Sequence, residues 1–150
     1  YYTLSWTERL FDQIWHDWYP ARNDNRHKLT VNATHRFNGK FDMYMQWNYH
    51  TGDRTTIPTQ IIDGHLYYSN PYNHKLPDYH RLDIGFNFRK TTRRGNESIW
   101  NLSIYNAYCR MNPLFAMVST TIREDKVEDY KFVTLGVLPI IPTFSYTLKF

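Results

Sequence analysis

The chain has 150 residues, enough for one domain or for a piece of a larger one. Aromatic residues make up 18% of a sequence that is polar on average, which argues against leucine-rich helical bundles, helical membrane spans and disorder. The net charge of +4 comes from scattered basic residues, so the composition does not indicate a nucleic-acid partner.

Apolar and polar side chains alternate along most of the chain, and this period of two predicts β-strands. In residues 41–49, for example, Phe41, Met43, Met45 and Trp47 alternate with polar neighbours. We predict six strands, which cover residues 1–11, 25–37, 40–50, 79–90, 97–110 and 130–150. Because the chain opens on strand-like residues without Met, we expect a fragment of a longer protein.

Short and long connections alternate between these strands. Phe37-Asn38-Gly39-Lys40 predicts a hairpin turn in which Asn-Gly supplies positive φ, and residues 92–96 predict a second tight turn. The long connections cover residues 12–25, 51–78 and 112–129. An antiparallel meander places alternate connections at opposite ends, so we expect all the short turns at one end.

Two all-β architectures fit this pattern. A soluble β-sandwich has strands of about 5–6 residues, whereas an outer-membrane barrel has strands of about 9–11 residues, short periplasmic turns and long outer loops. The length of the predicted strands and the aromatic residues near their ends favour an antiparallel transmembrane β-barrel. Its polar face would line the lumen with Arg81, Asp83 and Arg89.

The last predicted strand ends in an alternating aromatic and apolar pattern that suits a membrane-inserted C-terminal strand. The residues of this pattern are Phe144, Tyr146, Leu148 and Phe150.

Several segments resemble the TonB-dependent receptors of the Gram-negative outer membrane. The matching segments are Tyr19-Pro20-Ala21-Arg22, Thr51-Gly52, Ile57-Pro58, Leu76-Pro77-Asp78-Tyr79-His80-Arg81-Leu82-Asp83, Ser103-Ile104-Tyr105-Asn106-Ala107-Tyr108, Arg110-Met111-Asn112-Pro113 and the terminal run 141–150. The resemblance covers nearly all of the chain. Cys109 stands where the family pattern suggests a polar residue such as Asn.

The resemblance implies that residues 1–150 form the last six strands of a 22-stranded plugged barrel. Such receptors bind a scarce solute outside the cell and import it with energy transduced by the TonB complex. The implied partners are the TonB complex acting through the missing N-terminal region, the plug domain of the same protein, the barrel-assembly machinery and outer-membrane lipid. The implied location is the cell outer membrane.

Solute contact is expected from aromatic residues in the predicted outer loops, which could stack on sugar rings or flat chelates. These residues are Trp15, Trp18, Tyr19, Tyr67, Tyr68 and Tyr72. Alternatively, these aromatic residues pack the loops against one another.

No motif in the sequence predicts catalysis or a cofactor. A metal site is not predicted either, because the spacing of His65, His74 and His80 matches no short ligand pattern. We therefore expect a transporter rather than an enzyme. Two other readings remain open. One is a different outer-membrane barrel, such as an adhesin or a passive pore. The other is a soluble carbohydrate-binding sandwich.

Overall fold

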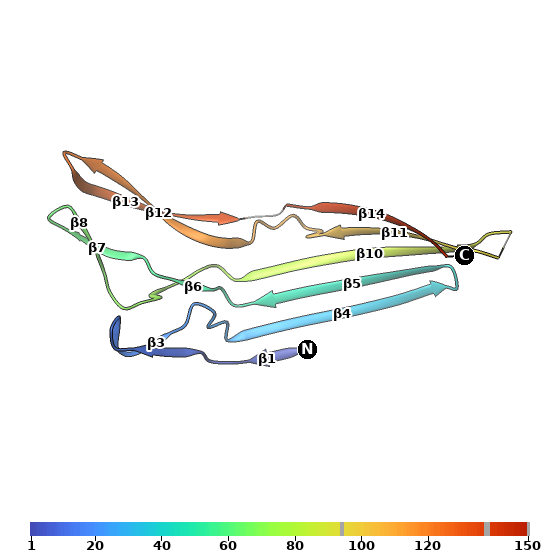
Figure 1. The fold of residues 1–150 in the computed structure, drawn as a ribbon, viewed down its shortest axis with the longest axis horizontal. Helices are drawn as coiled ribbons and strands as arrows, with labels where there is room; N and C mark the ends of the chain where they lie inside the picture. Colours follow the sequence, from blue (N-terminus) through green and yellow to red (C-terminus); the bar gives the residue numbers. More distant parts are fainter. Residues whose placement is uncertain (94, 137–138, 150) are drawn as a thin grey trace.

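The computed structural model describes residues 1–93, 95–136 and 139–149, and these residues form β-strands without any helix. Six strands form one antiparallel sheet, hydrogen-bonded in the order in which they are named here (Figure 1). They are β1 (Tyr2–Leu4), β4 (His27–Asn38), β5 (Phe41–His50), β10 (Tyr79–Thr91), β11 (Glu97–Tyr105) and β14 (Ile141–Lys149). The predicted all-β, antiparallel meander is confirmed. The described strands do not close into a barrel, because β1 and β14 each pair on one side only.

The long connections fold into smaller two-stranded sheets. These pair β2 (Glu8–Phe11) with β3 (Trp15–Pro20), β6 (Arg54–Thr55) with β9 (His74–Lys75), β7 (Pro58–Ile62) with β8 (His65–Tyr68), and β12 (Pro113–Arg123) with β13 (Lys126–Gly136). Figure 1 shows them at one end of the main sheet, opposite the short turns. We call these two ends the loop end and the turn end. The predicted segregation of short and long connections is confirmed.

Three predicted strand boundaries are wrong. Residues 1–11 are divided between β1 and β2, because the chain leaves the main sheet after Leu4. Residues 130–150 are divided between β13 and β14, with Pro139, which has no amide hydrogen to donate, between them. The strand predicted over 97–110 ends at Tyr105. Phe150 lies outside the described residues.

The turn between β4 and β5 forms where it was predicted, but for a different reason. Positive φ values occur at Gly64 and Gly95 among the described glycines, not at Gly39. The Asn38 side chain instead closes the turn, because its Oδ1 accepts hydrogen bonds from the amides of Lys40 at 2.8 Å and Phe41 at 2.9 Å.

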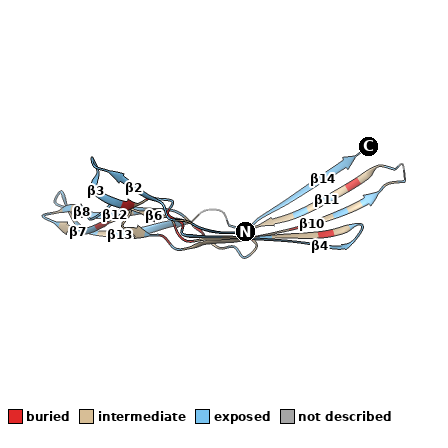
Figure 2. Ribbon diagram, turned by 90° about the horizontal axis from the view of Figure 1, so that it is seen from below, coloured by how far each residue is buried: buried red, intermediate tan, exposed pale blue. Residues whose placement is uncertain are grey.

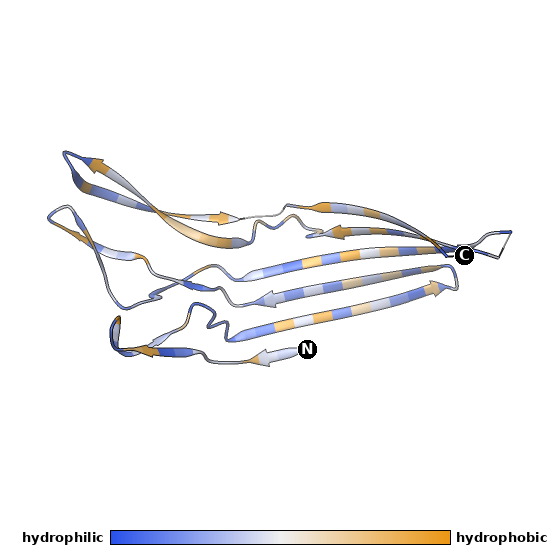
Figure 3. Ribbon diagram, viewed as in Figure 1, coloured by the Kyte–Doolittle hydropathy of each residue, from blue (hydrophilic) through white to orange (hydrophobic). Residues whose placement is uncertain are grey.

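The strand register places the apolar side chains of neighbouring strands on one face of the main sheet. Ile104 pairs with Ile84, Ile84 with Met45, and Met45 with Ala33. The same alternation is visible as orange and blue bands along β4 and β10 (Figure 3). The apolar face, as we call it, carries Leu29, Val31, Ala33, Met43, Met45, Trp47, Leu82, Ile84, Phe86, Leu102, Ile104 and Phe144.

The main sheet has no apolar core of its own. Among the described residues, the buried hydrophobic side chains are Tyr19, Ala21 and Leu76, none of which belongs to the six strands. Phe144 on the apolar face is 60% exposed, and the strands in Figure 2 are mostly coloured as intermediate or exposed. A β-sandwich needs a second sheet over this face, and no other described sheet covers it. No helix of sufficient length and apolarity to cross a membrane is present in the described residues.

Candidate functional site

The apolar face carries an aromatic row at each end. The turn-end row stacks Phe41 on Phe88, with ring centroids 4.4 Å apart, and places Trp100 against Tyr146 at 4.8 Å. Since Phe88 and Trp100 are paired across the strands, these rings form one line across four strands. Phe37 extends the line by stacking on Phe41 at 4.9 Å.

The loop-end row lies eight residues further along the strands. Tyr49 pairs with His80, and Trp47 stacks beside Tyr49 with ring centroids 6.0 Å apart. His80 Nδ1 and the Tyr108 hydroxyl are hydrogen-bonded at 2.6 Å. The residues between the two rows are almost all aliphatic or aromatic; among the described ones His35 is the polar exception, and its ring meets the edge of Phe37.

The opposite face of the sheet is polar and internally paired. Arg89 Nη1 lies 2.6 Å from Asp42 Oδ2, and Arg81 Nη2 lies 2.9 Å from Asp83 Oδ2. The three residues predicted to line a lumen, Arg81, Asp83 and Arg89, thus share this face, and each is held in an ion pair. Tyr44 packs on it directly over Gly85, where an added Cβ atom would clash with the Tyr44 ring.

Arg81 organises a small pocket where the polar face meets the loops. Its Nη1 donates to the hydroxyls of Tyr105 at 2.6 Å and Tyr79 at 3.0 Å, while its guanidinium carbon lies 4.1 Å from the centre of the Tyr105 ring. A pocket of about 250 Å³ is lined by these three residues together with Asn106, Asn112, Pro113 and Leu114. Both phenol oxygens accept hydrogen bonds from Arg81, so one guanidinium joins the two tyrosine rings at this edge of the sheet.

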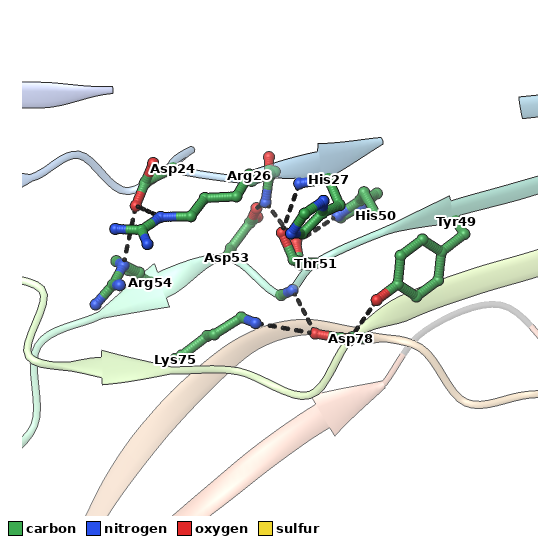
Figure 4. A network of polar contacts seen from close by, with 12 residues as sticks. Asp24, Arg26, His27, Tyr49, His50, Thr51, Asp53, Arg54, Lys75 and Asp78 are labelled. Carbon is green, nitrogen blue, oxygen red and sulfur yellow. Dashed lines mark hydrogen bonds and ion pairs between the residues drawn. The ribbon is translucent and has the colours of Figure 1, made fainter. Parts of the chain in front are cut away.

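Buried polar side chains tie the loops to the ends of the strands. Figure 4 shows the part of this network around β6, where the Asp24 carboxylate lies 3.5 Å from Arg54 Nε and 3.6 Å from Arg26 Nε. Asn25 Nδ2 donates to the backbone oxygen of Thr51 at 2.7 Å and also lies 2.6 Å from Asp53 Oδ1. These contacts fasten the first long loop to the second.

Asp78 fastens the second long loop to β5. It accepts hydrogen bonds from the Gly52 amide at 2.9 Å and from the Tyr49 hydroxyl at 2.7 Å, and it pairs with Lys75 at 3.3 Å. Burial alone would raise the pKa of the Asp78 carboxyl, but these three partners together hold that pKa below its ordinary value.

Two asparagines perform the same task for the third long loop. Asn112 Oδ1 accepts from the His80 amide at 3.1 Å, and Asn112 Nδ2 donates to the His80 oxygen at 2.8 Å, so the side chain copies a strand pairing. Asn106, which is 1% exposed, makes two similar bonds to Arg110. Its Nδ2 donates to the Arg110 backbone oxygen at 2.9 Å, and its Oδ1 accepts from the Arg110 amide at 3.1 Å. Arg110 Nη2 in turn donates a hydrogen bond to the backbone oxygen of Asp78 at 3.1 Å.

We call this set of residues the collar. It consists of Asp24, Asn25, Thr51, Asp78, Asn106, Arg110 and Asn112. Several of these residues lie in the segments that resemble the receptor family, but the sequence predicted no role for them. The local signals for the collar were the Asn and Asp residues next to strand ends, such as Asp78 just before β10 and Asn106 just after β11. Asn106 has a positive φ of 54°, which Asn tolerates better than most residues. The arrangement is structural, because nearly every polar atom in it already has a protein partner.

The six aromatic residues predicted to contact a solute do not gather in one place. Trp15 and Trp18 lie on the β2–β3 hairpin, and Tyr67 and Tyr68 lie on β8; all four are exposed. Tyr19 and Tyr72 come from different loops and stack with ring centroids 6.2 Å apart. Tyr19 is buried.

Metal-binding groups are not assembled in the described residues, where no cluster of three or more His, Cys, Asp or Glu side chains occurs. His65 lies on β8, and the His74 ring contacts Phe132 of β13 edge-on. His80 belongs to the loop-end aromatic row.

Comparison of the chain with protein families, with curated proteins and with solved structures gave no match.

Proposed function

We propose that this chain is the C-terminal wall and outer-loop region of an outer-membrane β-barrel, and that the parent protein is a TonB-dependent receptor that imports a scarce solute. The observation that carries the proposal is the exposed apolar face bounded by two aromatic rows. The resemblance of the loop and strand-end segments to that receptor family adds the importing role. No residue of the chain is assigned a catalytic step.

The dimensions of the apolar face support the membrane part of the proposal. The rows at Phe88 and His80 are separated by eight residues of β10, which is about 27 Å along a strand that rises about 3.3–3.4 Å per residue. A strand tilted by about 40° spans about 20 Å of membrane thickness over this length, comparable to the apolar band of about 25 Å on such barrels. Aromatic side chains suit the two borders of that band, because they have an apolar body and a polar edge.

The edges of the sheet support the view that more strands belong to it. In the described residues β14 pairs only with β11, which leaves the other side of a nine-residue strand without hydrogen-bond partners. β1 pairs only with β4. In a barrel, strands upstream of Tyr1 would satisfy both edges and leave none exposed to aggregation.

The polar face supports a water-lined interior. Its paired charges, Arg89 with Asp42 and Arg81 with Asp83, remain stable in contact with water or with a plug domain. The collar would stand at the outer mouth of the barrel and hold the loops in position around it.

The proposal is tested with the full-length protein that contains this chain. Membrane fractionation should place it in the outer membrane, and Trp100 fluorescence should be quenched by lipids brominated along the acyl chain. Solute uptake should stop when the proton gradient is dissipated or TonB is removed. Recovery of the protein in the soluble fraction would contradict the membrane assignment and favour the carbohydrate-binding sandwich.

The upstream sequence separates the remaining barrel functions. A plug domain before Tyr1 is required by the importer proposal. Its absence from an outer-membrane protein would favour an adhesin or a passive pore instead.

A further inference from the structure

A second pocket lies among the loops and is built differently from the one beside Arg81. Its volume is about 320 Å³, at the small end of the range for ligand sites. It is lined by Arg22, Arg54, Thr55, Thr56, Tyr72, Leu76, Phe115 and Ala116. These residues come from all three long connections, so a ligand bound here would touch each of them.

One side of this pocket is cationic. Arg22 is exposed, and within the described part of the chain its guanidinium has no hydrogen bond or ion pair. Arg54 contacts Asp24 through Nε at 3.5 Å, and none of its other nitrogens has a side-chain partner among the described residues. No acidic residue lines the pocket, and the Asp24 carboxylate is only 2% exposed.

The charge of Arg54 is incompletely balanced, because Asp24 is shared. Its carboxylate also lies 3.6 Å from Arg26 Nε and accepts a hydrogen bond from the Thr7 amide at 3.1 Å. One buried carboxylate therefore faces two guanidinium groups, and Arg22 adds a third positive charge nearby. Such an excess of positive charge in a partly enclosed site attracts an anion.

The other side of the pocket is flat and apolar. The Tyr72 ring is held by stacking on Tyr19, with centroids 6.2 Å apart, and its backbone is fixed by a hydrogen bond from the Tyr72 amide to Thr56 Oγ1 at 3.0 Å. Phe115 and Leu76 complete this wall. Since Thr56 Oγ1 accepts from Tyr72, its hydroxyl hydrogen is available to a ligand on the cationic side.

We infer that this pocket binds a small amphipathic anion, namely a carboxylate or phosphate group attached to a flat or apolar body. Arg22 and Arg54 bind the anionic group, and Tyr72 and Phe115 contact the body. The inference rests on the proposed function in one respect, which is that the pocket faces the external medium and receives the imported solute.

The test uses the full-length protein purified in detergent, with phenyl phosphate as the probe and benzyl alcohol as its neutral counterpart. Binding is measured by saturation-transfer NMR titration. Arg22→Gln should weaken phenyl phosphate binding about tenfold, since it removes a charge-assisted contact. Combining it with Arg54→Gln should abolish binding. Arg123→Gln is the matched control, because that side chain is 75% exposed at the tip of the β12–β13 hairpin, eight residues along β12 from Phe115. It should leave the affinity unchanged.

Arg22→Gln is informative even if the double variant does not fold, because Arg22 has no described partner to lose. Equal phenyl phosphate affinity in Arg22→Gln and Arg123→Gln would overturn the inference, as would equally tight binding of benzyl alcohol. Lipopolysaccharide offers the same phosphate chemistry, so binding of its micelles without binding of phenyl phosphate would also overturn it. A protein found outside the outer membrane would refute the proposed function but leave this titration valid.

Discussion

Ile104 and Ser103 are neighbours on β11 that lie on opposite faces of the sheet, and they offer the sharpest test of which face meets lipid. Ile104 pairs with Ile84 and Pro142 on the apolar face. Ser103 pairs with Gly85 and Thr143 on the polar face. Changing each of them separately to Arg adds the same charge to the same strand at the same depth.

The expected magnitude follows from where Ile104 lies between the aromatic rows. Its partner Ile84 is four residues from Phe88 and four from His80, or about 13 Å along the strand from each row. Ile104 is therefore close to the middle of the proposed apolar band, where Arg on the lipid side of a barrel costs about 2–4 kcal/mol. The Ser103→Arg change, on a wet face, should cost about 0.5 kcal/mol or less.

The assay is urea unfolding of the refolded full-length protein in lipid vesicles, followed by tryptophan fluorescence. Outer-membrane levels of the two variants provide a second readout, because a destabilised barrel accumulates poorly. If Ser103→Arg is as destabilising as Ile104→Arg, or more so, the assignment of the two faces is wrong.

Three further predictions concern the collar and the turn beside it. Asn112→Ala should lower the free energy of unfolding by about 2–4 kcal/mol, because the buried Asn112 side chain loses both of its bonds to the His80 backbone. Asn112→Asp should lose only the donor, and Asn23→Ala, at an exposed position, should be nearly neutral. Urea titration compares the three variants. Since the pKa of Asp78 is lowered in the folded state, its contribution to stability is present above the ordinary Asp pKa and is lost as the pH falls through the lowered value. Asp78→Asn should therefore flatten the acid side of a plot of melting temperature against pH, and an unchanged slope would exclude this role. Cys109 has a φ of 55°, so Cys109→Asn should raise stability by about 0.5–1 kcal/mol in the same urea assay, because Asn tolerates this conformation better; a loss of stability would contradict that reasoning.

The faces of the main strands were predictable because their signal is local. Alternation with a period of two needs only neighbouring residues, and it correctly predicts that Trp47, Ile84 and Phe144 lie on the apolar sides of their strands. Strand ends were less predictable. Residues 130–150 alternate well enough to suggest one strand, although Gly136 and Pro139 mark the interruption. The hairpins within the loops carry mixed polar and apolar residues, and their pairing depends on contacts between loops, such as the Val127 amide donating to the Gly64 oxygen at 3.1 Å.

The collar and the pocket lined by Arg22 and Arg54 could not be predicted from the sequence, because their residues are far apart in the chain. Asn112 bonds to His80 across 32 residues, and Arg22 meets Phe115 only through the fold. The sequence predicted solute contact from the aromatic residues of the long loops and gave the same weight to Trp18 and Tyr72. The structure separates them, because Tyr72 lies in a pocket with two arginines and Trp18 lies on an exposed strand.

The distribution of burial gives a physical reason why the loops can form a specific site on this scaffold. In a water-soluble domain the apolar side chains of the sheet would be buried and its loops would be exposed. Here the apolar side chains of the main sheet are half-buried or exposed, and most of the buried residues lie at the loop bases, where Asp24, Asn106 and Asn112 are almost fully enclosed. A buried polar side chain with all its bonds satisfied fixes geometry, because any other arrangement leaves a group unpaired. The backbones of Arg22 and Arg54 are joined by a hydrogen bond of 2.8 Å, and Arg54 is paired with Asp24 of the collar. The collar therefore positions this part of the proposed pocket before a ligand arrives, which would lower the entropic cost of binding.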